Sequence, residues 1–490
     1  MRRRNCNVNQ GGLIGGETRS GFRESIVARK CRNGHGAKGF RKMEDVKERN
    51  SQNTHERVLE KAKPAGEIRT RWEWTEAEVW TERMLTALEN GVNGGKWHSL
   101  IDKVYKHENL ESAFNRVRKN GGSAGVDHET AQHFSENLTE NIAILSNRLK
   151  QERYLPCAVR RVEIKKAGKR EVRPLGIPTI RDRTVQAALY NVIAPIFEVD
   201  FAQHSYGFRP GLGCKDALRR VDELLKQGYV HVVDADIRNF FERISHKQLL
   251  LRIEKKIADG RVLKLIDVFL NQEVMYEASK WIPEEGTPQG SVLSPLLSNI
   301  YLNPLDHMMK KAGIEMVRYA DDWIALCRST EEAESALSKA EKWLRHNGLE
   351  LHPEKTRLVD ASKRGGFDFL GYHFERGYRW PSKKSERKLR DTIRSKTKRN
   401  NGHSMESIIE NINKTLRGWF EYFKHGYHTT FLPIDQWVRM RLRSILRKRR
   451  GGRGRGRGDD HHRWPNAWFK DYGLFSLTAA HVSNCQSLKR

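Results

Sequence analysis

Apolar residues recur at helical spacing in the first third of the chain. Between residues 71 and 120 they return every three or four positions, and the runs end in glycine, as helices do. Trp74, Val79, Met84 and Leu85 would line one face there, and we expect that face to pack in a core.

The stretch 329–348 carries the clearest helix pattern. Its apolar positions follow an i, i+3, i+4, i+7 order and are Ala333, Ala336, Leu337, Ala340, Trp343 and Leu344. Ser329 with Glu332 predicts a capping box at the start of this helix, and Gly348 predicts its end.

After residue 377 the pattern becomes that of basic amphipathic helices. One helix would place Ile408, Ile412, Leu416, Trp419 and Phe423 on one side, and the next would present Trp437, Met440 and Ile445 before a dense run of positive charge. The Arg-Gly run 451–458, "GGRGRGRG", has low complexity. Such a run lacks side chains that fill a core, so we expect it to stay flexible.

Short strand-like runs alternate with helical patterns between residues 124 and 371, which favours an α/β or α+β domain. In "VRYADDWIALC", Asp321 and Asp322 lie at the tip of an expected hairpin. In "YVHVVDADIRNFF", Asp234 and Asp236 end a run rich in valine, on one face of a strand. Adjacent aspartates alone are also typical of a solvated turn.

The charge of the chain changes how these acids are interpreted. Lys and Arg number 90 against 61 Asp and Glu, which gives a net charge of +29. A surplus of this size favours a polyanionic partner. We expect nucleic acid rather than a membrane, because no apolar run approaches the ~18 to 20 residues of a spanning helix. Six dispersed cysteines without a C-x-x-C pair fit a reducing, cytoplasmic location.

Carboxylates on separate strands of a strongly basic chain point to phosphoryl transfer. Two Mg²⁺ ions about 3.5 to 4 Å apart can hold the attacking oxygen and the leaving phosphate, and they need acidic ligands from different elements. Asp236 together with the pair Asp321 and Asp322 meets that need.

The order of the remaining blocks is more specific. They run "RPLGIP", "SYGFRPG", "DADIRNFF", "TPQGSVLSPLLSN", "RYADD", "LHPEKT" and "FLGYHF", followed by "NKTLRGWFEYFK" and "RWPNAWFKDYGLFSL". From about Trp72 to nearly the end, the sequence resembles the reverse transcriptase/maturase encoded by bacterial group II introns.

That resemblance implies an α+β, right-hand polymerase fold, with fingers and palm, a helical thumb/maturase domain and basic flexible tails. Residues 1–65 are rich in Gly, Arg, Lys and Asn with few periodic apolar positions, so we expect a mostly disordered basic extension there. The parts that follow are an N-terminal helical extension (66–120), fingers and palm (121–376), the thumb with maturase-specific domain X (377–450), and an Arg-Gly linker with a C-terminal segment (451–490).

The implied activity is RNA-directed DNA polymerisation with two Mg²⁺ ions, combined with assistance to splicing and mobility. The implied partners are the parent group II intron RNA, an RNA template with a DNA primer, target DNA and dNTPs. Two alternatives remain, namely a standalone defence or diversity-generating reverse transcriptase, which would lack the maturase region, and a splicing-only maturase, which would not need the three aspartates.

The resemblance also implies roles for the acids and their neighbours. Asp236 matches the first catalytic aspartate, Asp321 the main aspartate of the hairpin, and Asp322 its companion, so these three would hold the metal. Asp234 is expected to support the end of its strand. Phe241 matches the aromatic gate against the sugar 2′-hydroxyl, whereas Phe240 suits core packing.

Further residues match contacts to the nucleotide. Lys166 and Arg173 match cations that clamp the triphosphate, with Lys165 as a rival for the first role. Gln289 and Gly290 match a contact to template and nucleotide, although Ser291 follows where many relatives have glycine. Lys355 matches a lysine that protonates pyrophosphate as it departs, and it is the fourth expected catalytic residue. The candidates for RNA binding are Arg417, Trp419, Arg447, Lys448, Arg449 and Arg450.

No DNA endonuclease is expected. The nuclease module of many relatives uses paired C-x-x-C motifs, and the only cysteine here after Cys327 is Cys485. The acids and histidines of "DDHHRW" (459–464) are consecutive, which disfavours a preorganised metal site.

Overall fold

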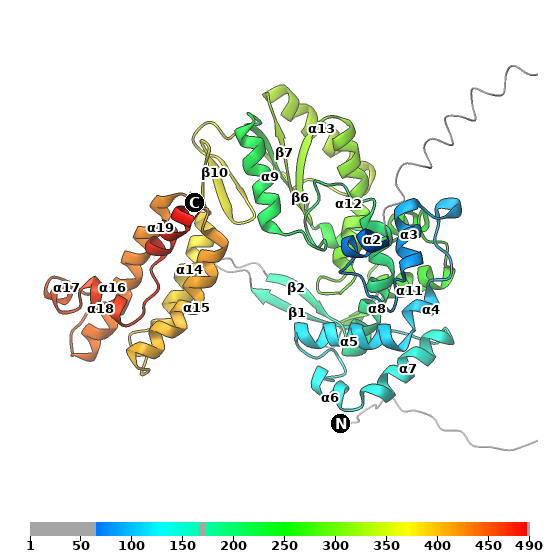
Figure 1. Cartoon of the computed structure of the whole chain (residues 1–490), viewed down its shortest axis with the longest axis horizontal. Helices are drawn as coiled ribbons and strands as arrows, with labels where there is room; N and C mark the ends of the chain where they lie inside the picture. The colour runs from blue at the N-terminus through cyan, green and yellow to red at the C-terminus, as the bar shows by residue number, and fades with distance from the viewer. Residues whose placement is uncertain (1–64, 166–171, 278, 488–490) are drawn as a thin grey trace, which may run out of the picture. The chain divides into compact units, whose positions relative to one another are not determined.

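The computed structural model describes residues 65–165, 172–277 and 279–487, all within one unit, Lys63–Arg490 (Figure 1). Apart from residue 65, the expected extension 1–65 lies outside the described residues. Among the described helices, none is long and apolar enough to cross a membrane.

Short helices at the N-terminal end pack around one long buried helix, α8 (Ile180–Glu198). They are α2 (Ala65–Arg71), α3 (Glu82–Asn90), η1 (Asn93–Gly95), α4 (Ile101–Val104), α5 (His107–Asn120), α6 (Ala131–Glu136) and α7 (Leu138–Lys150). Trp80 fixes one of these contacts, because its buried indole N–H donates to the carbonyl of Asn191 in α8 at 2.9 Å. As expected, Val79 and Leu85 are buried in this core.

The first sheet has the order β2-β1-β4-β5. Its strands are β1 (Val159–Lys165), β2 (Val172–Ile177), β4 (Val274–Tyr276) and β5 (Ser279–Trp281). β1 and β2 pair as an antiparallel hairpin. The tip of that hairpin, 166–171, lies outside the described residues.

The central sheet has the order β6-β7-β3-β8, and every pairing in it is antiparallel. Its strands are β6 (Glu315–Tyr319), β7 (Asp322–Cys327), β3 (His231–Asp236) and β8 (Arg357–Asp360). Alternate residues of a strand face opposite sides. Val232, Ile324 and Leu326 therefore share a core cluster with α9 (Cys214–Lys226), whereas their neighbours Val233 and Ala325 share one with α12 (Ser294–Lys311) and α13 (Thr330–His346).

α13 matches the predicted helix closely. The Ser329 hydroxyl accepts from the Glu332 amide, and Gly348 follows the helix with a φ of 74°. Three further short helices, η2 (Phe240–Glu242), α10 (His246–Glu254) and α11 (Gly260–Leu270), connect β3 to β4. η2 begins four residues after Asp236, so it lies beside the end of the acidic strand.

A small third sheet, β11-β10-β9, leads into the C-terminal helices. Its strands are β9 (Phe367–Phe369), β10 (Tyr372–Glu375) and β11 (Tyr378–Pro381). The helices are α14 (Lys383–Lys396), α15 (Met405–Phe423), η3 (His428–Thr430), α16 (Phe431–Arg449), α17 (Asp459–Arg463), α18 (Asn466–Asp471) and α19 (Leu477–Ser487).

α15 buries the face predicted from the sequence, whereas α16 buries only Ile445 of the three apolar residues named for it. The buried apolar residues of α16 are Ile434, Val438, Leu442 and Ile445, while Trp437 and Met440 are only partly buried. This buried face of α16 differs from the predicted one because α17–α19 pack against α16. The periodicity within α16 alone gives no information about that contact.

The Arg-Gly run also differs from the expected flexible linker. The Gly452 amide donates to the Arg447 carbonyl at 2.9 Å, and a Cβ on Gly456 would lie 2.9 Å from the Cβ of Arg443. The run therefore follows a close path along α16. Beyond it, Trp464, Phe469 and Leu477 are buried in the same core as α14–α16.

Candidate active site

The acidic residues meet at one edge of the central sheet. Asp236 ends β3 and stands directly opposite Asp322 in the antiparallel register with β7. Asp321 lies in the turn between β6 and β7, which confirms the predicted hairpin. The turn is tight, because Ala320 takes a φ of 60° just before Asp321.

Negative charge accumulates at this edge. Desolvation by the surrounding strands, followed by the charges of Asp321, Asp234 and Asp236, raises the pKa of Asp322 to about 7. This shift occurs although Asp322 itself remains exposed to solvent. A nearby positive charge would therefore reduce the electrostatic repulsion among these carboxylates.

Two cationic side chains from the segment after α13 form ion pairs with two of these aspartates. The Lys355 ammonium lies 2.5 Å from Oδ2 of Asp236, and the His352 amide donates to the Asp236 carbonyl at 2.8 Å. The Arg357 guanidinium donates to Oδ2 of Asp234 at 2.9 Å. The structure thus brings Lys355 to the catalytic candidates. It ties Asp234 to the neighbouring strand β8, in keeping with the expected supporting role.

Phe240 lies in the core, as expected, whereas Phe241 lines a pocket. Phe240 is 2% exposed, whereas Phe241 is partly buried and lines a pocket of about 320 Å³. The rest of the lining comes from Glu242, from the first sheet and from the turn 283–289, and includes Arg161, Trp281 and Gln289.

The turn containing Gln289 and Gly290 lies against β2. The Gly176 amide donates to the Gln289 carbonyl at 2.6 Å. Gly290 has a φ of 114°, and a Cβ there would fall 2.2 Å from the Gly176 carbonyl oxygen. β2 therefore approaches this glycine closely, and the contact of Gly290 to template and nucleotide stays a prediction. Ser291 donates to Oε1 of Gln186 at 2.9 Å, which anchors the turn to α8.

The clamp residues are only partly described. Lys166 lies outside the described residues. Of Lys165 and Arg173 the structure describes the backbone only, in β1 and β2. Their predicted contacts to a triphosphate remain predictions.

The candidates for RNA binding differ in their exposure and in the contacts that their side chains make within the protein. Trp419 packs between the ring of Phe423, at 4.8 Å, and that of Phe431, so much of its surface serves the core. Arg447 forms an ion pair with Asp460 at 2.5 Å. Arg417 is exposed, with its guanidinium over the ring of Phe475.

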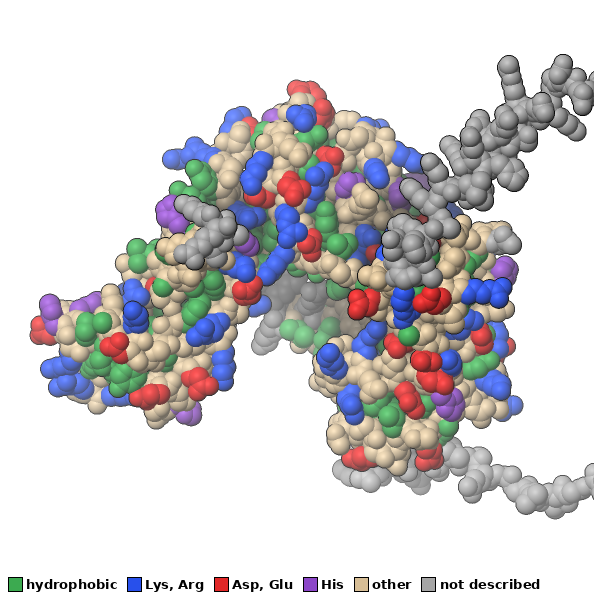
Figure 2. Space-filling view, viewed as in Figure 1, with side chains coloured by type: hydrophobic (Ala, Val, Ile, Leu, Met, Phe, Trp, Pro, Cys, Tyr) green, Lys and Arg blue, Asp and Glu red, His purple; other side chains and the backbone are tan. Residues whose placement is uncertain are grey.

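At the end of α16, Lys448, Arg449 and Arg450 are all exposed. Arg449 donates to the carbonyl of His403. Figure 2 shows that Lys and Arg side chains are spread over much of the visible face rather than confined to these positions.

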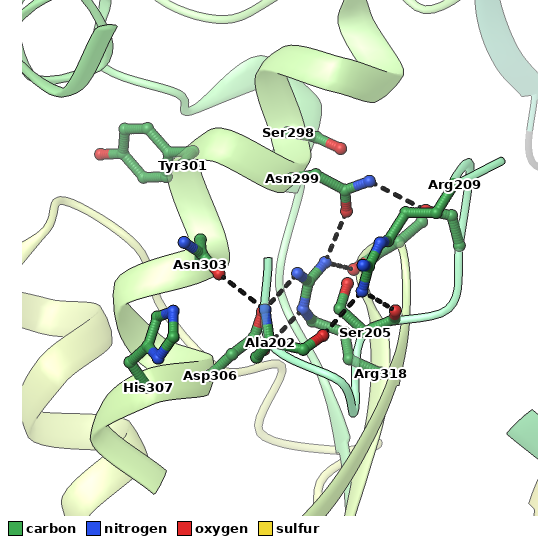
Figure 3. Close-up of polar contacts among 12 residues, drawn as sticks. Ala202, Ser205, Arg209, Ser298, Asn299, Tyr301, Asn303, Asp306, His307 and Arg318 are labelled. Atoms are coloured by element: carbon green, nitrogen blue, oxygen red, sulfur yellow. Dashed lines mark hydrogen bonds and ion pairs between the residues drawn. The ribbon is translucent and has the colours of Figure 1, made fainter. Parts of the chain in front are cut away.

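One functional candidate escaped the sequence reasoning. Arg318 in β6 is fully buried and pairs with Asp306 of α12, and Nη1 of Arg318 also donates to the Ala320 carbonyl at 2.9 Å (Figure 3). The sequence does contain a signal for this residue, since Arg318 is a charged residue inside the apolar run before Asp321.

The donor set suits a hard divalent cation, because all three candidate ligands are carboxylates. Among the described residues, no three His, Cys, Asp or Glu side chains already form a group that could hold a metal ion.

Comparison with known proteins places these features in context. Residues 164–374 match the reverse transcriptase (RNA-dependent DNA polymerase) family, and residues 386–464 match the group II intron maturase-specific domain. The chain is 28% identical over 330 residues to protein YkfC of Escherichia coli (strain K12), which covers 59% of this chain and 85% of YkfC.

It is also 29% identical over 360 residues to the group II intron-encoded protein LtrA of Lactococcus lactis subsp. cremoris, which covers 56% of this chain and 59% of LtrA. The chain therefore spans less than two thirds of the length of LtrA. A solved structure of telomerase from Candida albicans, with a fragment of telomeric RNA, aligns at 12% identity with a TM-score of 0.39, over 64% of this chain and 63% of that one.

Proposed function

Since the chain belongs to the family of group II intron-encoded reverse transcriptase/maturases, we propose that it is an RNA-directed DNA polymerase that also binds its parent intron RNA and assists splicing and mobility. The observation that carries the polymerase proposal is the register of the central sheet. It sets Asp236 opposite Asp322, with Asp321 in the adjoining turn.

Two Mg²⁺ ions are the proposed cofactor, held by the carboxylates of Asp236, Asp321 and Asp322. Desolvation and the neighbouring carboxylates raise the pKa of Asp322 to about 7, and divalent cations would offset the negative charge of those carboxylates. When bound, such ions supply positive charge to the attacking oxygen and to the leaving phosphate. Lys355 would release Asp236 as the metal takes its place.

Lys355 then has a second task. During nucleotidyl transfer the primer 3′-hydroxyl attacks the α-phosphorus of the dNTP, and pyrophosphate leaves. We assign to the Lys355 ammonium the donation of a proton to pyrophosphate, which is worth ~10²- to 10⁴-fold in rate for a general acid. The 2.5 Å contact of the Lys355 ammonium with Asp236 supports this assignment, because it keeps the proposed donor next to a proposed metal ligand.

The nucleotide would be selected and held by the surrounding elements. Phe241 would close against the 2′-position of the sugar, and Gln289 with Gly290 would border the template and nucleotide. Lys166 and Arg173 would bind the triphosphate. A location of Phe241 and Gln289 in one pocket supports a shared binding site.

RNA binding is proposed for the basic surface of the C-terminal helices. Residues 121–376 would form fingers and palm, and the thumb would begin near residue 377. The burial of Trp464, Phe469 and Leu477 with α14–α16 supports a thumb that continues past residue 450. The exposed residues Lys448 and Arg450 would contact phosphates of the intron RNA, and Arg417 would join them.

The separation of the two activities can be tested with purified full chain and intron RNA. Asp236→Ala or Asp321→Ala should abolish cDNA synthesis on an RNA template, because each removes a metal ligand. Both variants should still bind the intron RNA and promote its splicing. Asp234→Asn is the matched control, since it removes a charge from the same strand and should retain polymerase activity. Loss of splicing in a folded Asp236→Ala variant would contradict the proposal.

A further inference from the structure

The turn that presents Asp321 is held by a buried polar network. Nε and Nη2 of Arg318 donate to the two carboxylate oxygens of Asp306, at 2.8 and 2.5 Å, and the two side chains are 0% and 1% exposed. Nη1 of Arg318 donates to Oδ1 of Asn299 and to the Ala320 carbonyl, each at 2.9 Å. Figure 3 shows Arg318 reaching from its strand toward Asn299 and Asp306 on the facing helix.

The same network reaches the turn from a second side. Nδ2 of Asn299 donates to the Gly207 carbonyl at 2.8 Å. A Cβ on Gly207 would lie 2.3 Å from the Ala320 nitrogen, so only glycine lets this segment approach the turn. The backbone of Arg318 also bonds to this segment, donating to the His204 carbonyl and accepting from the Tyr206 amide.

These contacts bear on one peptide unit. The Ala320 carbonyl belongs to the planar peptide bond that ends at the nitrogen of Asp321. Fixing that carbonyl therefore fixes the direction in which the chain enters Asp321. Ala320 is also held at a φ of 60°, a conformation that a non-glycine residue keeps only when its surroundings enforce it.

A buried ion pair is a costly way to stabilise a fold, because apolar residues of similar volume often serve as well. Arg318 offers something that such residues lack, namely a donor aimed at the turn. We propose that Arg318, oriented by Asp306 and Asn299, is a positioning residue that sets the direction of Asp321. This inference rests on the proposed polymerase function.

Three variants of the full chain test it. Arg318→Lys keeps the charge for Asp306 but lacks the fork of donors. The double variant Arg318→Met with Asp306→Leu replaces the pair by apolar side chains and should fold. Arg252→Lys is the control, because this partly buried arginine of the same domain bonds to Asn347 and to the Tyr301 carbonyl, away from the turn.

The measurements are kcat and KM for single-nucleotide primer extension on RNA, the affinity for Mn²⁺ by electron paramagnetic resonance without nucleotide, and thermal unfolding. Both Arg318 variants should lose about 10- to 100-fold in kcat, as when the support of a metal ligand is removed. Their KM for dNTP should stay within about threefold, and Mn²⁺ should bind more weakly. Arg252→Lys should lower thermal stability only.

Full kcat and Mn²⁺ affinity in either folded Arg318 variant would overturn the inference. So would an equal loss of kcat in Arg252→Lys. If both Arg318 variants fail to fold, Arg318 serves the fold as a whole and the positioning role is rejected. Failure of the wild-type chain to extend a primer would instead refute the proposed function.

Discussion

At the scale of single residues, Phe241 allows a test of the pocket that we propose for the nucleotide. Its partly buried ring lines the pocket, while the ring of Phe240 lies in the core at a centroid distance of 5.2 Å. Phe241→Ala should raise the incorporation of ribonucleotides relative to deoxynucleotides, because the wall against the 2′-hydroxyl is removed. Primer extension with matched dNTP and rNTP series measures this ratio. Phe240→Ala should instead cost about 3–5 kcal/mol of stability. An unchanged ratio in Phe241→Ala would place the gate at another residue.

A second residue gives the protein a predictable pH dependence. Burial raises the pKa of Asp182 from 3.8 to about 6, although Tyr154, Thr179 and Cys157 donate hydrogen bonds to it. A folded-state pKa above the unfolded value means that protonated Asp182 stabilises the fold fully below about pH 4. That contribution, about 3 kcal/mol for a shift of this size, is lost as the pH rises through 6.

Asp182→Asn should therefore gain stability relative to the wild type as the pH is raised from 4 to 7. Urea unfolding at each pH gives the difference between the two proteins, which cancels the titration of all other groups. A difference that stays constant across this range would show that Asp182 titrates normally.

At the scale of elements, the C-terminal segment should behave as part of the helical core. Phe469 in α18 is fully buried, and its ring lies under the guanidinium of Arg443 in α16 at 5.1 Å. Phe469→Ala should lower the free energy of unfolding by about 3–5 kcal/mol. Val482→Ala, on the exposed side of α19, should change it by less than about 0.5 kcal/mol. Equal, small effects from both would mean that the segment is only loosely attached.

The elements also show what the sequence could and could not predict. α13 and α15 follow from periodicity, because each buries one apolar stripe. The buried face of α16 includes Asp435, whose carboxylate accepts from the amides of Leu477 and Thr478, and Arg443, which donates to the Trp464 carbonyl. These partners lie 21 to 43 positions away in the chain. Hydrophobic periodicity does not register a polar group buried by so distant a partner.

The same limit applies at the active site. The order of the sequence blocks singled out the three aspartates and Lys355, and the structure brings Asp236, Asp322 and Lys355 together. The part played by Asp306 could not, because its pairing with Arg318 depends on how α12 packs on the central sheet.

At the scale of the whole molecule, the net charge of +29 should govern RNA affinity. The logarithm of the association constant should fall linearly with the logarithm of salt concentration, with a slope of about −0.7 to −0.9 per phosphate neutralised. Lys448→Gln should reduce that slope by about one phosphate contact. Lys226→Gln should leave it unchanged, since Lys226 pairs with Asp222 at 2.8 Å. Filter binding over a salt series provides the slopes, and a flat response would contradict a phosphate-binding surface.

One core cluster joins the catalytic sheet to the C-terminal helices. Val232, Ile324 and Leu326 of the central sheet share it with Phe374 of β10 and Phe423 of α15. This shared core constrains how such a gene can decay. We expect that a descendant without the proposed polymerase activity could replace Asp236, because a surface carboxylate contributes little to folding. It would still have to keep the apolar side chains of this cluster, since they also support α15, part of the surface that we propose for RNA binding.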